Sequence, residues 1–188
     1  MKAPIGKRGY FAVGVERISK PMNAGNLFRT AHAFGASFLF TIAADYPRRR
    51  APSDTSRAPL HLPLHEFADV EALRLPEGCR LIGIELLDEA VELPSFRHPP
   101  RAAYVLGPEK GALSPALVAR CQEIVKIPSA FCINVATAGA IVMYDRLITL
   151  GRFARRPLSS LGEAEPPPAH VQGAQIFRTA RDEGKKRE

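Results

Sequence analysis

Short apolar runs alternate with segments of helical spacing along most of this chain, and this alternation constrains its fold more than any other feature. The runs over residues 10–15 and 38–42 are bounded by small or polar residues and have the length of buried strands. Further runs cover residues 81–86, 102–106 and 123–127. Strands that alternate with helices predict an α/β protein with an open, mostly parallel sheet and helices on both faces.

The segment between the first two runs predicts a helix. Asn23 is a favourable N-cap, and Leu27, Ala31 and Phe34 repeat at helical spacing. Gly35 follows, where a helix often ends in a left-handed residue. The chain from residue 10 to residue 42 is therefore expected to form a strand, a helix and a strand.

Two further helices are expected in the second half of the chain. Ser114 and Pro115 supply a cap and a first-turn proline for one of them. Residues 134–153 contain no proline and are almost continuously apolar, which predicts a buried helix. Small residues that permit close helix packing gather near its start: Ala136, Ala138, Gly139 and Ala140.

The chain is long enough for one substantial hydrophobic core, because it has 188 residues of which 46% are hydrophobic. We expect one domain over residues 1–155. Residues 156–188 are rich in proline and charge, which predicts a mobile tail.

The charge of the chain favours a polyanionic partner. The formal net charge is +7 and the isoelectric point is about 9.7, so nucleic acid is the first candidate and an anionic membrane surface the second. A basic loop is a candidate for contact with RNA phosphates, and simple solvation of that loop is an equally open reading. Its residues are Arg48, Arg49, Arg50 and Arg57, with Lys7 and Arg8 adding to the field.

The sequence predicts a cytoplasmic protein without a membrane span, a disulfide or a bound metal. No apolar stretch reaches the roughly 20 residues that cross a bilayer, and the first residues lack the apolar centre of a signal peptide. Cys79, Cys121 and Cys132 show no paired or metal-like spacing. His61 and His65 flank Pro63, and we expect exposed loop histidines rather than ligands.

Three separate segments each join a backbone turn to polar residues beside an apolar run. The first reads Asn-Ala-Gly-Asn-Leu-Phe-Arg over residues 23–29, and the second reads Leu-Gly-Pro-Glu-Lys-Gly-Ala-Leu-Ser over residues 106–114. The third reads Ile-Pro at 127–128 and Phe-Cys-Ile-Asn-Val at 131–135. Because open α/β sheets bind ligands beyond the carboxyl ends of their strands, the three segments predict one active site.

Together and in this order, the three segments resemble the SpoU or TrmH branch of the SPOUT RNA methyltransferases, over roughly residues 11–155. The resemblance implies transfer of a methyl group from S-adenosylmethionine to a ribose 2′-OH of tRNA or rRNA, without a metal. It also implies a homodimer, with the helix after Asn134 as a plausible contact. A deep trefoil knot over residues 106–155 is implied by the resemblance alone, since knots are essentially absent from ordinary folds.

The resemblance also assigns roles to individual residues. Arg29 is expected to position the ribose hydroxyl, because a guanidinium with a pKa above about 12 is a poor base. The other residues expected at the reaction centre are Asn23, Glu109 and Asn134. The residues expected around the cofactor are Ile84, Leu106, Gly107, Ile127, Cys132 and Ile133.

Two departures from the family pattern keep other readings open. Ala112 replaces a glycine, and Gly111 is the candidate to supply the turn instead; Cys132 replaces a serine, which removes a good hydrogen-bond donor. The first alternative is a catalytically silent RNA-binding protein of the same fold. The second is an unrelated α/β enzyme that binds a nucleotide or an acidic metabolite.

Overall fold

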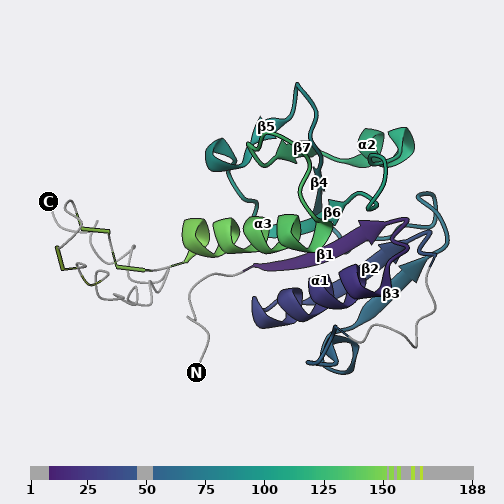
Figure 1. Cartoon of the computed structure of the whole chain (residues 1–188), viewed down its shortest axis with the longest axis horizontal. Helices are drawn as coiled ribbons and strands as arrows, with labels where there is room; N and C mark the ends of the chain where they lie inside the picture. Colours follow the sequence, from purple (N-terminus) through teal and green to yellow (C-terminus); the bar gives the residue numbers. More distant parts are fainter. Residues whose placement is uncertain are drawn as a thin grey trace, which may run out of the picture. The chain divides into compact units, whose positions relative to one another are not determined.

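The structure is a computed structural model (Figure 1) that describes residues 9–45 and 53–151, together with 153, 154, 156, 157, 162, 163 and 166. Its contacts divide the chain into two units, Met1–Arg152 and Phe153–Glu188, and the fold below is that of the first unit. The predicted domain boundary at residue 155 and the mobile tail remain predictions, since most of the tail lies outside the described residues. The same holds for five of the basic residues singled out above: Lys7, Arg8, Arg48, Arg49 and Arg50.

A seven-stranded sheet forms the centre of the described unit (Figure 1), in the order β3-β2-β1-β6-β4-β7-β5. Every neighbouring pair is parallel, which confirms the predicted α/β class. The strands are β1 (Tyr10–Glu16), β2 (Phe38–Ile42), β3 (Leu64–Phe67), β4 (Arg80–Ile84), β5 (Val91–Glu92), β6 (Arg101–Leu106) and β7 (Glu123–Lys126).

Helices cover both faces of this sheet, as predicted. On one face, α1 (Pro21–Ala33) and α3 (Val135–Leu150) pack against each other and share a core cluster with Val13 and Val15 of β1. On the other face, α2 (Pro115–Arg120) and the segment around Val70 pack on Ala12. Residues of β1 thus alternate between the two clusters, as the period of a strand requires. Two short 3₁₀ helices lie in the connections, at Ala58–Leu60 and Leu93–Ser95.

Close packing of α1 on α3 depends on Gly139. A Cβ atom added at Gly139 would lie 2.3 Å from Cδ1 of Leu27, which is fully buried on α1. This confirms that the small residues early in the last helix permit close approach. The N-terminus of this helix, Asn134, is thereby held beside the start of α1.

The start of α1 differs from the prediction. The helix begins at Pro21, with Lys20 as the N-cap residue and no side-chain cap, so Asn23 lies within the helix and the prediction that it is the N-cap was wrong. Pro21 favours this earlier start because its missing N–H is not needed in the first turn. The predicted end is confirmed, since Gly35 has a φ of 76°.

Other boundaries differ in smaller ways. The strands β3 and β5 were not predicted; β3 carries two exposed polar residues in its centre, and β5 has only two residues. The last helix ends at Leu150 rather than near residue 153. Among the described residues, no helix is long and apolar enough to cross a membrane.

Candidate active site

The three polar segments meet at the carboxyl edge of the sheet, where the order of the strands reverses. From β1 the chain proceeds to β2 and β3 on one side, and β6 and β4 lie on the other side. The loops that follow β1, β4, β6 and β7 therefore converge beside the β1–β6 pair, the position at which open α/β sheets bind ligands.

Glu109 joins the second segment to the start of α1. One of its carboxylate oxygens, Oε2, accepts hydrogen bonds from the backbone N–H and the hydroxyl of Ser19, both at 3.2 Å. The other, Oε1, accepts from the backbone N–H of Lys20 at 3.0 Å and from Nδ2 of Asn23 at 3.1 Å. A carboxylate from a loop about 90 residues away along the chain thus accepts hydrogen bonds from backbone N–H groups at the N-terminus of α1, where a negative charge is favourable.

Asn23 extends this chain of side chains to the third segment. Its Oδ1 accepts a hydrogen bond of 3.0 Å from Nδ2 of Asn134. Asn134 is the N-cap of α3, as predicted, and its Oδ1 accepts from the backbone N–H of Ala136 at 2.9 Å. Glu109, Asn23 and Asn134 therefore form one polar chain that links all three segments.

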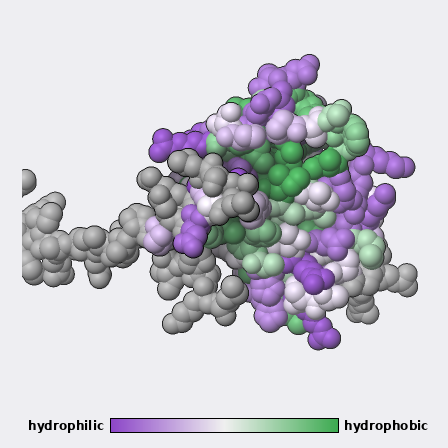
Figure 2. All heavy atoms as spheres, turned by 60° about the vertical axis from the view of Figure 1, so that its left-hand side comes forward, coloured by the Kyte–Doolittle hydropathy of each residue, from purple (hydrophilic) through white to green (hydrophobic). Residues whose placement is uncertain are grey.

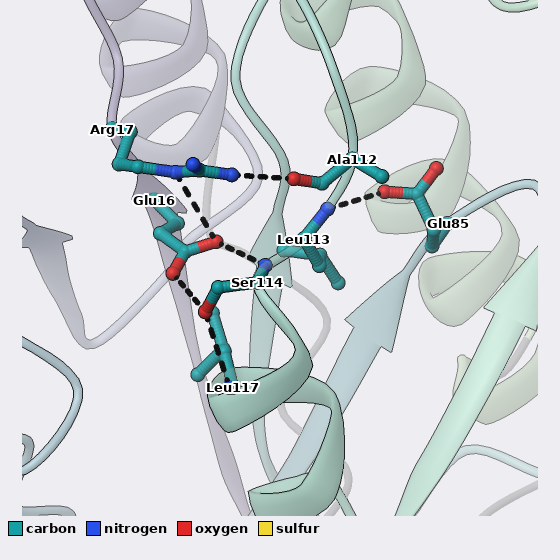
Figure 3. Close-up of polar contacts among 7 residues, drawn as sticks. All are labelled: Glu16, Arg17, Glu85, Ala112, Leu113, Ser114 and Leu117. Atoms are coloured by element: carbon teal, nitrogen blue, oxygen red, sulfur yellow. Dashed lines mark hydrogen bonds and ion pairs between the residues drawn. The ribbon is translucent and has the colours of Figure 1, made fainter.

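The loop over residues 107–114 is held by carboxylates from two strand ends (Figure 3). Glu16, at the end of β1, is only 2% exposed and accepts from the backbone N–H of Ser114 at 2.8 Å and from its hydroxyl at 2.5 Å. Glu85, just after β4, accepts from the backbone N–H of Leu113 at 2.8 Å. Arg17 donates from Nη2 to the carbonyl of Ala112 at 2.6 Å.

The same loop explains the first departure from the family pattern. Gly111 has a φ of 95°, a left-handed conformation that favours glycine, whereas Ala112 has no positive φ. The expectation that Gly111 supplies the turn is confirmed. The hydroxyl of Ser114 accepts from the backbone N–H of Leu117 at 3.2 Å, which confirms Ser114 as the cap of α2.

Two adjoining cavities open at this edge of the sheet. The larger, of about 210 Å³, is lined by residues of all three segments and by the end of β4. The smaller, of about 80 Å³, shares Ile84, Cys132 and Ile133 with it and adds Ile127. The predicted site residues on the wall of the larger cavity are Asn23, Ile84, Leu106, Gly107, Glu109, Cys132, Ile133 and Asn134.

Arg29 is the predicted site residue that the structure leaves apart from the cavities. It lies on the exposed face of α1 with Asn26, on the side opposite the buried Leu27, and it lines neither cavity. Among the described residues no hydrogen bond or ion pair engages its guanidinium. Arg29 is therefore free to contact a substrate that approaches from solvent.

Sequence analysis missed the two carboxylates that hold the loop, Glu16 and Glu85. Glu16 directly follows the predicted strand 10–15, and that position is the signal that would have found it. Glu85 lay inside the predicted strand 81–86, whereas in the structure it directly follows β4, which ends at Ile84. It also missed Lys20, which lines the larger cavity.

No metal centre is formed by the part of the chain that the structure describes, where no group of three or more His, Cys, Asp or Glu side chains is suitably placed. His61 and His65 are both exposed, but His65 belongs to β3 and His61 stacks on His32 with 4.9 Å between ring centroids. The prediction that both are loop histidines was therefore wrong for His65.

The pKa of Glu109 predicts how the polar chain responds to acid. Partial burial opposes ionisation, but hydrogen bonds from its own backbone, Ser19, Asn23 and Lys20 outweigh this and lower the pKa below its usual 4.5. A lowered carboxyl pKa stabilises the fold above the unfolded-state pKa, and this contribution is lost as the pH falls through the folded-state pKa. We expect Glu109→Gln to lower the free energy of unfolding at neutral pH, and the difference from wild type to shrink below about pH 4.5.

Urea unfolding across this pH range measures the effect. The exposed Glu77→Gln serves as the control and should show little difference at any pH. A loss in Glu109→Gln that is the same at acid and neutral pH would show that the ionised carboxylate contributes nothing.

Fold and site together define an open parallel α/β protein with a ligand cavity at the switch point of its sheet. Within that class, the chain belongs to the SpoU rRNA methylase family, whose model matches residues 10–144. This confirms the resemblance to the SpoU or TrmH branch that the three segments indicated.

A relative among characterised proteins is the tRNA (guanosine(18)-2′-O)-methyltransferase TARBP1 of Mus musculus. It is 30% identical over 159 residues, which make up 80% of this chain and 10% of the mouse protein. The chain thus spans about a tenth of the length of this relative.

Solved structures of the family share the fold. One, described as giving insight into the 2′-OH methylation of C/U34 on tRNA, is 26% identical with a TM-score of 0.66, and the match covers 78% of this chain and 94% of that one. The SpoU methyltransferase AviRb from Streptomyces viridochromogenes, in complex with AdoMet, is 24% identical with a TM-score of 0.64. That match covers 77% of this chain and 62% of AviRb.

Proposed function

We propose that this protein is an S-adenosylmethionine-dependent methyltransferase that acts on a ribose 2′-OH of tRNA or rRNA. The observation that carries the proposal is the polar chain Glu109–Asn23–Asn134, which brings three distant segments to the wall of one cavity. Membership of the SpoU family supports it, as do the names of the relatives, which describe ribose 2′-O-methylation of tRNA.

The cavity fits the cofactor in its chemistry. Apolar side chains of Ile84, Leu106 and Ile133 line it beside a few polar groups, which is the general pattern of small-molecule and cofactor sites. At Gly107 the wall is formed by backbone, and an added Cβ atom would lie 3.2 Å from Oε2 of Glu85. We therefore propose that these residues, with Ile127 and Cys132, hold S-adenosylmethionine.

When bound, the cofactor supplies a methyl group that is already activated by a positively charged sulfur. Methyl transfer would form the bond from the ribose oxygen to carbon and break the carbon–sulfur bond, with the bonding electron pair left on sulfur and the hydroxyl proton released to solvent. The protein has mainly to align the reactants, which supplies much of the rate. We assign alignment of the ribose to Arg29 from its exposed position, and organisation of the cavity wall to Asn23, Glu109 and Asn134.

We further propose that the protein is a homodimer in which α3 contributes buried surface. Ile141, Tyr144 and Ile148 are large apolar residues of α3 that lie 37%, 52% and 38% exposed, at spacings that place them on one side of the helix. Figure 2 turns the side of the molecule that carries the end of α3 toward the viewer and shows hydrophobic surface on that face. Two-fold pairing is the commonest arrangement of soluble oligomers. Light scattering should return a dimeric mass.

A catalytically silent RNA-binding protein of the same fold is the second candidate, favoured by Cys132 in place of a serine. Cys132 is exposed and lines both cavities, so its thiol faces the proposed reaction centre.

The cytoplasmic location of the protein also remains a proposal.

Calorimetry with S-adenosylmethionine, followed by an RNA methylation assay, separates the candidates. Saturable binding of the cofactor and transfer of its labelled methyl group to RNA is the expected result. RNA binding without uptake of the cofactor would instead support the silent protein. Uptake of another nucleotide without RNA binding would support an unrelated α/β enzyme.

A further inference from the structure

A third cavity, of about 300 Å³, adjoins the proposed cofactor cavity and has a basic wall. The two cavities share Lys20, Pro108 and Glu109, and the third also takes in Arg17, Ser19 and Lys110. Three cationic side chains and one carboxylate therefore line it, so its wall carries a net positive charge.

The three cationic side chains of this wall differ in the contacts that they make within the protein. Arg17 donates to the carbonyl of Ala112, and its Nε lies 3.8 Å from Oε2 of Glu16, so it holds the loop in addition to contributing charge. Lys20 and Lys110 are exposed, and within the described parts of the chain their ammonium groups have no hydrogen bond or ion pair. Two ammonium groups are thus available to a ligand.

Glu109 is the one carboxylate of the wall, and both of its oxygens are engaged in hydrogen bonds within the protein. Each of its oxygens accepts two hydrogen bonds, from Ser19 on one side and from Lys20 and Asn23 on the other. These donors stabilise its negative charge without cancelling it, and the three cationic side chains outnumber it, so a ligand meets a net positive charge.

We propose that this basic cavity binds a backbone phosphate of the substrate RNA, next to the ribose that receives the methyl group. This inference rests on the proposed function, because it needs an RNA substrate in the adjoining site. A phosphate suits ammonium groups that act as point charges on flexible stems. Holding the strand at a phosphate fixes the position of the ribose without reading its base.

The test compares Lys20→Ala, Lys110→Ala and the double variant with wild type, using end-labelled total cellular RNA in filter-binding titrations over a range of salt. Each single variant should lose about fivefold in affinity and lower the salt dependence of log K by about one unit. Lys20→Arg and Lys110→Arg should restore most of the loss. Arg97→Ala is the matched control, because Arg97 is exposed just before β6, at the opposite end of that strand from the site.

Cofactor binding and RNA binding together show whether only the phosphate site or also the proposed function is wrong. Calorimetry with S-adenosylmethionine should give wild-type affinity in Lys110→Ala, because Lys110 lines the basic cavity and not the proposed cofactor cavity. A loss of cofactor affinity in that variant would overturn the proposal by assigning the basic cavity to the cofactor. RNA affinity or salt dependence that matches Arg97→Ala would also overturn it, while the proposed function would stand. If wild-type protein retains no RNA at all, the proposed function and this inference are both wrong.

Discussion

Replacing Arg29 with alanine should slow methyl transfer at saturating RNA by about 100-fold or more, while the affinity for S-adenosylmethionine stays at the wild-type value. Arg29 lies on the exposed face of α1 and lines neither cavity, so its removal leaves the proposed cofactor site intact. Its proposed role is to orient the ribose hydroxyl or its phosphate through the planar guanidinium. Arg29→Lys keeps the charge and loses that planar fork, so its rate should also fall steeply.

Single-turnover conditions keep lost RNA binding from being mistaken for lost chemistry. Arg97→Ala removes another exposed arginine, just before β6 at the opposite end of that strand from the site, and should react at the wild-type rate. Near-normal transfer in Arg29→Ala would show that the first segment serves only the fold, through Asn23 and the start of α1.

Replacing Gly107 with valine should reduce the affinity for S-adenosylmethionine about tenfold or more, which corresponds to about 1.4 kcal/mol. The backbone at Gly107 forms part of the cavity wall. An added Cβ atom would lie 3.2 Å from Oε2 of Glu85 and 3.3 Å from the nitrogen of Leu113, two atoms that share a hydrogen bond. The branched side chain would therefore both fill the approach to the backbone and displace the loop.

Gly107→Ala adds a single carbon at the same place and should show a smaller loss of the same kind. Ala112→Gly changes the same loop without adding an atom and should bind as wild type does, since Gly111 already supplies the left-handed residue. Thermal unfolding of each variant checks that the domain remains folded. Unchanged cofactor affinity in Gly107→Val would contradict the assignment of the cavity.

The sequence sufficed for the elements whose signals are local. The apolar runs of β1, β2 and β6 and the caps Ser114 and Asn134 are each recognisable within a few residues, and the structure has them as predicted. The edge strands β3 and β5 were not predicted because a strand with one neighbour needs little apolar surface. The centre of β3 is formed by two adjacent exposed polar residues, and β5 has only two residues.

Many residues of the cavity wall were predictable from the sequence, but the long-range hydrogen bonds between them were not. Family motifs located Asn23, Glu109 and Asn134, yet the sequence suggested that Asn23 caps α1. In the structure Glu109 supplies the acceptor at the start of α1, and Glu16 holds Ser114, which is 98 residues away along the chain. Contacts of such separation depend on the assembled sheet, so no local pattern contains them. The knot also remains a prediction from the resemblance.

Mapping ribose methylation in cellular RNA, with and without the gene for this protein, tests the proposed activity most directly. We predict that at least one 2′-O-methylated nucleotide of tRNA or rRNA disappears when the gene is removed. The mark should return when the wild-type protein is restored and should stay absent when only Arg29→Ala is restored. An unchanged map of ribose methylation in both tRNA and rRNA would contradict the assignment of this protein as an RNA 2′-O-methyltransferase.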